Sequence, residues 1–232
     1  MVYITNKRFN LWYKNMNKTY PVSCEISGPA AMFTRPDSGS SFVSYPAPTY
    51  SACCGILSSV AWMKTAFIRP VKVHICRPIV YHRYCVNYNG PLRKGINISG
   101  GNPYQYYCMI LIDVCYQIFG EAEEVRSRDL LSNPQNAKYE SYLDHNNRHH
   151  IQDLFNRRLK QGRLHSTPFL GQKEFTPDYF GPLRPESQPV ESINETINSM
   201  LFKVFDKDAF GEVNPTFHQN VKIEKGVLRY AE

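Results

Sequence analysis

The sequence predicts an α+β fold, and three observations support that prediction. Two segments, near residues 48–64 and 147–162, carry apolar residues at helical spacing. The runs around them are rich in β-branched and aromatic residues, which are typical of strands. Hydrophobic residues make up 42% of the 232 residues and charged residues 20%, so the chain can bury a core of its own.

The N-terminal half of the predicted fold begins with a strand over residues 20–26, where apolar residues alternate with polar ones. A turn-rich stretch follows over residues 28–46. Pro48 is expected to open the first helix, because proline suits a first helical turn, and the helix is expected to run to about Lys64. These elements give a strand, a long turn and a helix.

The middle of the chain predicts further strands. The apolar runs 71–75 and 78–84 are interpreted as one strand that continues past a proline-induced kink. Residues 106–119 are β-branched and aromatic enough for another long strand. Residues 121–144 are acidic and polar, which indicates a linker.

The second helix is expected to begin near Asn147, a good N-cap, and to end at Gly162, a good C-terminal stop. Its apolar stripe is Ile151, Leu154, Phe155 and Leu159. Beyond it, short strands separated by Pro-rich loops are predicted over residues 168–175, 199–205 and 221–230.

The order β-α-β-β-α, completed by one more strand, predicts a ferredoxin-like, RRM-type βαββαβ domain. We expect a basic N-terminal arm over residues 1–18, the ferredoxin-like domain over residues 19–168, and a small C-terminal β appendage over residues 169–232. A sheet of this kind presents one open face, and RNA-binding domains use that face widely.

The charge balance favours a polyanionic partner. There are 27 Lys and Arg against 20 Asp and Glu, a net charge of +7, and phosphate contacts release counterions. Sixteen Tyr and thirteen Phe could stack RNA bases or fill an aromatic core. The basic residues of the middle strands form either an RNA-facing patch or ordinary solvated charge: Lys64, Arg69, Lys72, Arg77, Arg83, Arg93 and Lys94.

The seven cysteines are odd in number and include no CxxC pair, which favours reduced thiols in a cytoplasmic protein over a disulfide framework. The N-terminal residues contain no apolar run long enough for a signal peptide, and no segment approaches the length of a membrane span. We therefore expect a cytoplasmic protein with no membrane partner.

Three pieces of the sequence, in order over roughly residues 20–180, resemble one known family. They are the turn Phe33–Pro36, the segment Phe42–Trp62, and the pair Phe155–Arg158 and Pro168–Phe175. Their pattern is similar to that of the CRISPR-associated Cas-five family, type I-C branch, of the RAMP superfamily. The resemblance covers about two thirds of the chain.

The resemblance implies a Cascade subunit that grips the 5′ handle of the guide RNA (crRNA), beside the backbone and large subunits, with target DNA as an indirect partner. It also implies cleavage of precursor RNA without metal or cofactor, leaving a 2′,3′-cyclic phosphate. Two alternatives stay open: a purely structural RNA cap whose guide another enzyme cuts, and a generic ferredoxin-like RNA-binding module.

Tyr45 aligns with the family's active-site tyrosine. Metal-free RNA cleavage needs a group that takes the 2′-OH proton, a group that protonates the leaving oxygen, and a cation near the phosphate. The phenol could donate a proton, but its ordinary pKa near 10 makes it a poor base at neutral pH. A tyrosine that anchors the loop or stacks a base is the other interpretation.

The family's Lys-His pair is not reproduced at the second helix. An ungapped alignment places it on His150 and Ile151, and a one-residue slip places it on His149 and His150, with Arg148 just ahead. Histidine suits acid–base work, and arginine holds phosphate well. The candidate catalytic residues are therefore Tyr45, His149 and His150, and the candidate RNA- or phosphate-binding residues are Arg148, Arg35, Lys64, Arg157 and Lys160.

The cluster 144–150 also suggests a metal site, because His145 and His149 stand at i, i+4. With Asn147 as the cap, however, His145 lies outside the helix, and no further ligand with recognisable spacing follows. We therefore predict no metal, and expect a solvated histidine cluster that faces phosphate.

Overall fold

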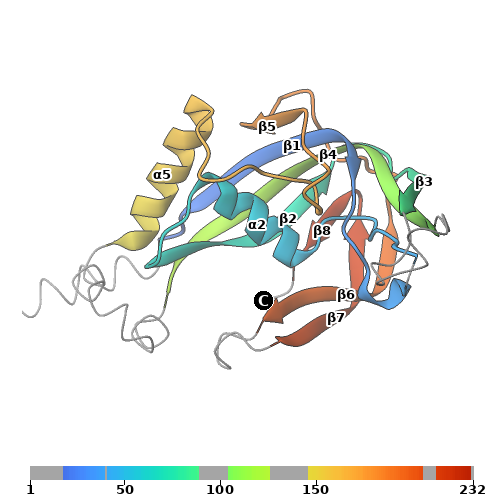
Figure 1. Ribbon diagram of the computed structural model, residues 1–232. Helices are drawn as coiled ribbons and strands as arrows, with labels where there is room; N and C mark the ends of the chain where they lie inside the picture. Colours follow the sequence, from blue (N-terminus) through green and yellow to red (C-terminus); the bar gives the residue numbers. More distant parts are fainter. Residues whose placement is uncertain (1–17, 40, 89–103, 126–145, 206–212, 231–232) are drawn as a thin grey trace, which may run out of the picture.

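The computed structural model describes residues 18–39, 41–88, 104–125, 146–205 and 213–230. The predicted mixture of helices and strands is confirmed, and an antiparallel sheet dominates the fold (Figure 1). Its elements are β1 (Pro21–Ala31), η1 (Pro36–Ser38), α2 (Tyr50–Val60), β2 (Ala66–Ile75), β3 (Tyr81–Tyr88), β4 (Tyr104–Glu124), α5 (Asn147–Gln161), β5 (Tyr179–Gly181), β6 (Glu195–Phe205), β7 (Val213–Glu224) and β8 (Val227–Arg229).

The strands form one sheet in the order β5-β1-β4-β2-β8-β7-β6, and every pair is antiparallel. The long strand β4 carries β1 on one edge. Its other edge carries β2 and β3 in succession, with Ile75 opposite Tyr116 and Tyr81 opposite Leu111. The predicted kinked strand is therefore two strands on the same edge of β4.

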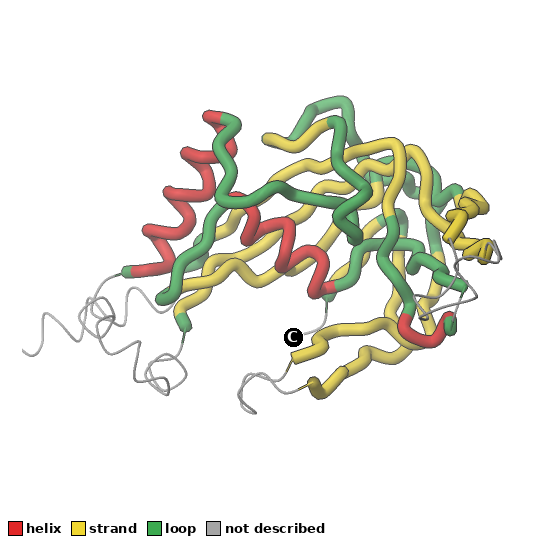
Figure 2. Tube along the Cα trace, viewed as in Figure 1, coloured by secondary structure: helices red, strands yellow, loops and turns green. Residues whose placement is uncertain are grey.

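Both helices lie on one face of the sheet (Figures 1 and 2). Residues of β1 alternate as predicted, so that Val22, Cys24 and Ile26 are buried beneath them. The stripe of α5 is also confirmed: Ile151, Phe155 and Leu159 are buried, and Leu154 is half-buried. Burial of these apolar side chains stabilises the helix layer on the sheet.

The C-terminal strands curl round toward α2. The strand β8 pairs with β2, which joins the C-terminal hairpin β6–β7 to the rest of the sheet. At the far end of the sheet, Phe202 of β6 packs on Tyr50 of α2 with ring centroids 4.2 Å apart. The hairpin thus covers the N-terminal end of α2.

A buried polar cluster occupies the sheet face opposite the helices. The Glu25 carboxylate is fully buried and accepts hydrogen bonds from the Arg184 guanidinium (2.6 Å), the Ser187 hydroxyl (2.8 Å) and the Gln117 amide (3.3 Å). These bonds tie the segment 182–190 across the centre of this face. The open sheet face expected for RNA is therefore covered at its centre.

The first helix is shorter than predicted. It begins after Thr49, whose hydroxyl accepts the Ala52 N–H, so Pro48 precedes the cap instead of opening the helix. It ends at Val60, because Ala61 takes an extended conformation. Residues 61–65 then run alongside α5, where the Thr65 hydroxyl bonds to the side chain of Asn147.

The second helix has the predicted extent, but its N-cap is one residue earlier. The Asn146 side chain accepts the His149 N–H at 3.2 Å, which satisfies one of the free donors of the first turn. Asn147 is instead buried against Thr65. Gly162 ends the helix in the left-handed conformation, as predicted.

No strand forms over residues 168–175, where one was predicted. The chain turns back on itself, and the Leu170 carbonyl accepts the Met32 N–H at 2.9 Å. Gly171 has φ +93°, and a Cβ there would lie 1.9 Å from the Met32 carbonyl oxygen. The glycine is required for this close backbone approach, which places Leu170 in the core.

The predicted strand 221–230 is the hairpin of β7 and β8. Lys225 and Gly226 form its tight turn, both with positive φ, the backbone that a two-residue hairpin turn needs. The predicted strand 199–205 is confirmed within β6. The predicted linker is strand as far as Glu124, and most of it, like most of the predicted N-terminal arm, lies outside the described residues.

Candidate nucleic-acid interface

Tyr45 is buried at the far end of β1. Its N–H donates to the Phe33 carbonyl (2.8 Å), and its hydroxyl accepts the Leu201 N–H of β6 (3.1 Å). Burial raises the pKa of the phenol above its ordinary value, although the hydrogen bond from Leu201 opposes that rise. Tyr45 therefore stays neutral at physiological pH and joins the loop before α2 to the C-terminal hairpin.

His149 and His150 are exposed on the first turn of α5. The His149 Nε2 lies 3.3 Å from the Asp153 carboxylate one turn later, and its ring lies 6.1 Å from that of Tyr20. The Arg148 guanidinium lies 5.3 Å from the same Tyr20 ring and 3.9 Å from Glu124. The two histidines can meet a ligand from solution, whereas Arg148 is only partly exposed.

The structure does not bring Tyr45 together with the two histidines. Tyr20, beside His149, precedes β1, and Phe33, bonded to Tyr45, follows it. The strand has 11 residues, and at a rise of about 3.3 Å per residue it separates the two places by roughly 35 Å. In Figure 1 the start of α5 and the loop before α2 lie on opposite sides of the molecule.

The predicted phosphate-binding residues fall into two groups. Arg35 lies near Tyr45, 5.8 Å from its ring, and pairs with Asp37 at 2.7 Å, so its charge is largely compensated. The others lie on or beside α5. Together with Arg163, which the sequence did not single out, they form what we term the α5 surface: Lys64, Arg148, Arg157, Lys160 and Arg163.

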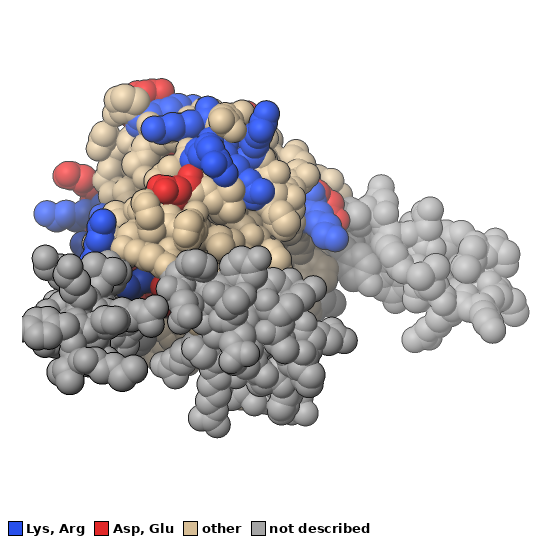
Figure 3. Space-filling view, turned by 90° about the vertical axis from the view of Figure 1, so that its left-hand side faces the viewer, with Lys and Arg blue, Asp and Glu red and all other residues tan. Residues whose placement is uncertain are grey.

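Figure 3 views the molecule from this side, and Lys and Arg side chains gather on the upper part of the face. Arg157, Lys160 and Arg163 are exposed and make no ion pair with any residue in the described ranges. Some basic character at the end of a helix is expected, because cations there interact favourably with the helix dipole. Three uncompensated cations are also what a phosphate chain would bind.

The basic patch suggested for the middle strands is less continuous. Arg69 pairs with Glu121 and Glu123, and Arg77 pairs with Asp113. Lys72 lies over the Phe119 ring at 4.6 Å and Arg83 over the Tyr107 ring at 4.1 Å. Arg93 and Lys94 lie outside the described residues.

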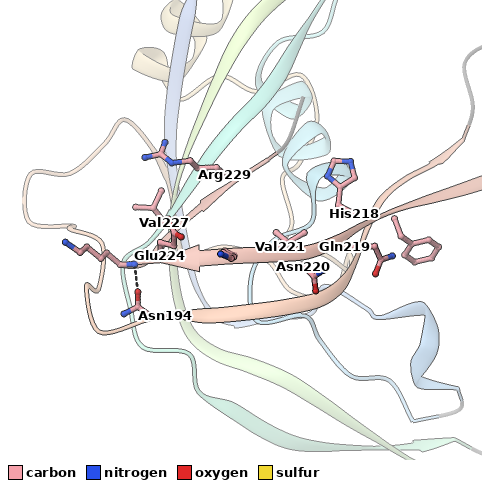
Figure 4. A pocket seen from close by; sticks show the side chains of 11 residues that line it. Asn194, His218, Gln219, Asn220, Val221, Glu224, Val227 and Arg229 are labelled. Atoms are coloured by element: carbon pink, nitrogen blue, oxygen red, sulfur yellow. Dashed lines mark hydrogen bonds between the residues drawn. The ribbon is translucent and has the colours of Figure 1, made fainter.

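A second basic region, the β7 groove, was not predicted (Figure 4). It is an open groove of about 1010 Å³, and the Asn194 side chain beside it accepts the Lys225 N–H at 3.0 Å. Its charged side chains are Lys222, Glu224, Lys225 and Arg229. The signal was present in the sequence as three cations within the run 222–229, but the prediction of one continuous strand concealed the turn.

Another depression, of about 480 Å³, lies between α2 and the segment 166–172, and no charged side chain lines it. Gly55 of α2 opens onto it, and a Cβ at that position would touch nothing within 4 Å. Close packing on the sheet therefore does not explain this glycine, although it does explain the fully buried Cys53 two residues earlier.

The described ranges contain neither a metal-binding cluster of side chains nor a helix that could span a membrane. No cluster of three or more His, Cys, Asp or Glu side chains in these ranges is placed to hold a metal ion. His145, which the metal interpretation needed, lies outside them. No described helix is both long and apolar enough to cross a membrane.

Comparison of the sequence with known proteins identifies two related proteins. The chain is 31% identical over 211 residues to the CRISPR pre-crRNA endoribonuclease Cas5d of Thermus thermophilus, which covers 83% of this chain and 77% of that protein. It is 28% identical over 169 residues to the protein of the same name from Mannheimia succiniciproducens, covering 66% and 69%. No known protein-family profile matches the chain.

The fold also has solved counterparts. A CRISPR-associated protein superposes with a TM-score of 0.65 at 17% identity, covering 93% of this chain and 95% of its own. The uncharacterized protein SMU1763c from Streptococcus mutans superposes with a TM-score of 0.64 at 16% identity, covering 91% and 92%. These two likenesses concern the fold. The sequence identity to Thermus Cas5d, extending over most of both chains, shows that this chain belongs to the Cas5 family of CRISPR-associated proteins.

Proposed function

We propose that this chain is a subunit of a CRISPR type I effector complex, Cascade, and that it binds the 5′ handle of crRNA through the α5 surface. The observation that carries the proposal is the 31% identity to a Cas5d that is named for acting on pre-crRNA. The other Cascade subunits are its proposed protein partners, and target DNA is an indirect one.

The proposed core of the subunit is a ferredoxin-like βαββαβ unit. The strand order β5-β1-β4-β2 supports this assignment, with α2 linking β1 to β2 and α5 lying between β4 and β5. The strand β3 would then be an addition on the edge of β4. Residues 19–168 hold all of this unit except its last strand, β5.

The α5 surface is the best-supported RNA contact for an electrostatic reason. RNA affinity comes largely from cations that replace the counterions of phosphates. Arg157, Lys160 and Arg163 are exposed cations without carboxylate partners among the described residues, whereas Arg35 already has Asp37. Binding at the α5 surface therefore breaks no ion pair of these three residues.

A second candidate function, cleavage of pre-crRNA, is favoured by the name shared by both relatives. The exposed His149 and His150 could exchange protons with the 2′-OH and the leaving oxygen, and Arg148 could hold the phosphate. Tyr45 would act indirectly, because its hydroxyl bonds to Leu201 inside the fold. The rival is a structural cap that binds RNA without cutting it.

The binding proposal is tested by the salt dependence of affinity for cognate repeat RNA. The variant Arg157→Ala/Lys160→Ala/Arg163→Ala removes three phosphate contacts, so the slope of log affinity against log salt should fall by about 2. A matched control, Lys222→Ala/Lys225→Ala/Arg229→Ala, removes the same charge from the β7 groove. If only the control lowers the slope, RNA binds the groove and the proposal is wrong.

The cleavage proposal is tested with end-labelled repeat RNA in EDTA. Cutting at one position by the wild type, lost in His149→Ala/His150→Ala while binding persists, would assign the chemistry to α5. Tight binding without cutting by the wild type would leave the structural cap as the function.

A further inference from the structure

Trp62 is unusually exposed for its size and type. It lies two residues after the end of α2 and keeps 51% of its surface open to solvent, although tryptophan is normally among the more buried side chains. Packing of the core does not explain a tryptophan at this position.

The Trp62 ring is backed by a second ring. The imidazole of His165 lies parallel to it, with an interplanar angle of 10° and centroids 6.0 Å apart. The backbone that carries His165 is held in place, because the main-chain N–H groups of His165 and Ser166 both donate to the Ser59 carbonyl, at 2.7 and 3.0 Å. The indole is therefore supported on one side and exposed over half of its surface.

Arginines at the C-terminal end of α5 lie close to the chain segments that carry these two rings. Arg158 donates to the Val60 carbonyl (3.0 Å), which ties α5 to the end of α2 two residues before Trp62. Arg158 also lines a depression of about 610 Å³. Leu164, another residue of its lining, directly precedes His165 in the sequence. Its lining contains three arginines and no carboxylate: Leu154, Arg157, Arg158, Gln161, Arg163 and Leu164.

A flat ring beside uncompensated guanidinium groups matches the chemistry of an unpaired nucleotide. The base offers a π-face for stacking, and its phosphates offer negative charge. A protein partner would need carboxylates to face Arg157 and Arg163, whereas every nucleotide carries both a negatively charged phosphate and a base that can stack. The charge distribution therefore favours RNA over a protein at this surface.

We propose that Trp62 is the stacking platform for an unpaired base of the bound RNA, with Arg157 and Arg163 holding the flanking phosphates. This inference rests on the proposed function and adds a specific contact to it. Stacking of one base on Trp62 fixes the register of the bound RNA at the C-terminal end of α5. His165 supports the platform from behind and makes no direct contact with RNA.

The test uses the fluorescence of Trp62. The sequence contains only two tryptophans, Trp12 and Trp62, so Trp12→Phe leaves Trp62 as the single indole of the full chain. This variant is titrated with single-stranded RNA of the cognate repeat handle, and with the same strand carrying abasic nucleotides. We expect the natural strand to quench most of the emission along its binding curve, and the abasic strand to bind without quenching it.

Affinity measured by anisotropy gives an independent readout. Trp62→Ala should weaken binding of the natural strand about 10-fold and leave binding of the abasic strand unchanged, while Trp62→Phe should keep most of the affinity. Because Trp62 is half exposed, both variants should retain the wild-type Tm. The Trp12→Phe parent should bind RNA as the wild type does.

The outcomes separate the inference from the function on which it rests. RNA binding by the Trp12→Phe variant with no change in Trp62 emission would overturn the inference and leave the proposed function intact. Absence of any RNA binding by the wild type would overturn both. If Trp62→Ala instead keeps its RNA affinity and loses binding to another subunit, Trp62 is a protein contact and the inference is wrong.

Discussion

The two ends of β1 carry the two halves of the site that the sequence predicted, and they differ in burial, bonding and charge. At one end, Tyr45 is 2% exposed and bonded to Phe33 and Leu201. At the other end, His149 and His150 stand in solvent beside Arg148. The first end holds the fold together, whereas the second is available to a ligand.

This difference shows what a resemblance in sequence can and cannot predict. The residue types before α2 and at the start of α5 both indicated RNA cleavage, and the Cas5 family that the motif around Tyr45 indicated is confirmed. Residue type does not report accessibility, however. A tyrosine that anchors a loop and a tyrosine that transfers a proton are identical in a motif.

The largest expected effect that separates the two ends is on stability. Tyr45→Ala should lower the free energy of unfolding by about 3–5 kcal/mol, because it leaves a cavity and an unpaired Leu201 N–H. Urea unfolding followed by circular dichroism measures this. A loss below about 1 kcal/mol would show that Tyr45 is not an anchor, and the contrast between the ends would disappear.

A second, pH-dependent effect belongs to the middle of β1. Burial alone would raise the pKa of Glu25, but hydrogen bonds from Arg184, Ser187 and Gln117 outweigh it and lower the pKa below its ordinary value. The carboxylate therefore stabilises the fold above its unfolded pKa of about 4.3, and this contribution is lost as the pH falls through the lower folded value.

The matched variant is Glu25→Gln, which keeps the shape and removes the charge. At pH 7 it should be less stable than the wild type by about 2–3 kcal/mol, because Arg184 loses its partner. The gap should narrow as the pH falls below about 4. A gap that stays constant from pH 7 to pH 3 in urea unfolding would contradict this account.

A smaller effect isolates the Tyr45 hydroxyl. Tyr45→Phe keeps the ring and leaves the Leu201 N–H without its acceptor, so it should cost about 1 kcal/mol. If RNA cleavage occurs, its rate at saturating RNA should change by less than about threefold, since the hydroxyl points into the fold. A much larger fall in rate without a matching loss of stability would place Tyr45 in the chemistry after all.

The smallest expected effect on stability is at the exposed end. His149→Ala/His150→Ala should change the free energy of unfolding by less than about 0.5 kcal/mol, because both side chains are solvated. The Asn146 cap remains, since it accepts a backbone N–H. Thermal unfolding of this variant beside Tyr45→Ala gives the sharpest measure of the contrast.

Much of the fold was predictable because local patterns decide it. The alternation in β1 and the stripe of α5 correctly identified their buried faces, and Gly162 correctly marked the helix end. The prediction over residues 168–175 was wrong because Gly171 makes a non-local contact with Met32. The apolar residues around it, Phe169, Leu170 and Phe175, gave no sign that the backbone just after β1 would lie so close.

The candidate site was less predictable, for a related reason. The positions of Arg157 and Lys160 on the outer face of α5 follow from helical spacing, and they were identified. The separation of Tyr45 from His149 depends on which end of β1 each approaches, and that is a property of the sheet topology. The exposure of Trp62 likewise depends on Ala61 leaving the helix one residue earlier.

The pairing of β8 with β2 has a consequence for how the protein melts. The residues after 168 supply β5 to one side of the sheet and β8 to the other, and Arg184 anchors to the centre of β1. Without the residues after 168, β1 loses its partner β5 and β2 loses its partner β8, and without the residues before 168, β5 and β8 lose β1 and β2 in turn. We therefore expect the two portions to unfold in a single calorimetric transition, and limited proteolysis near residue 168 to yield no stable fragment.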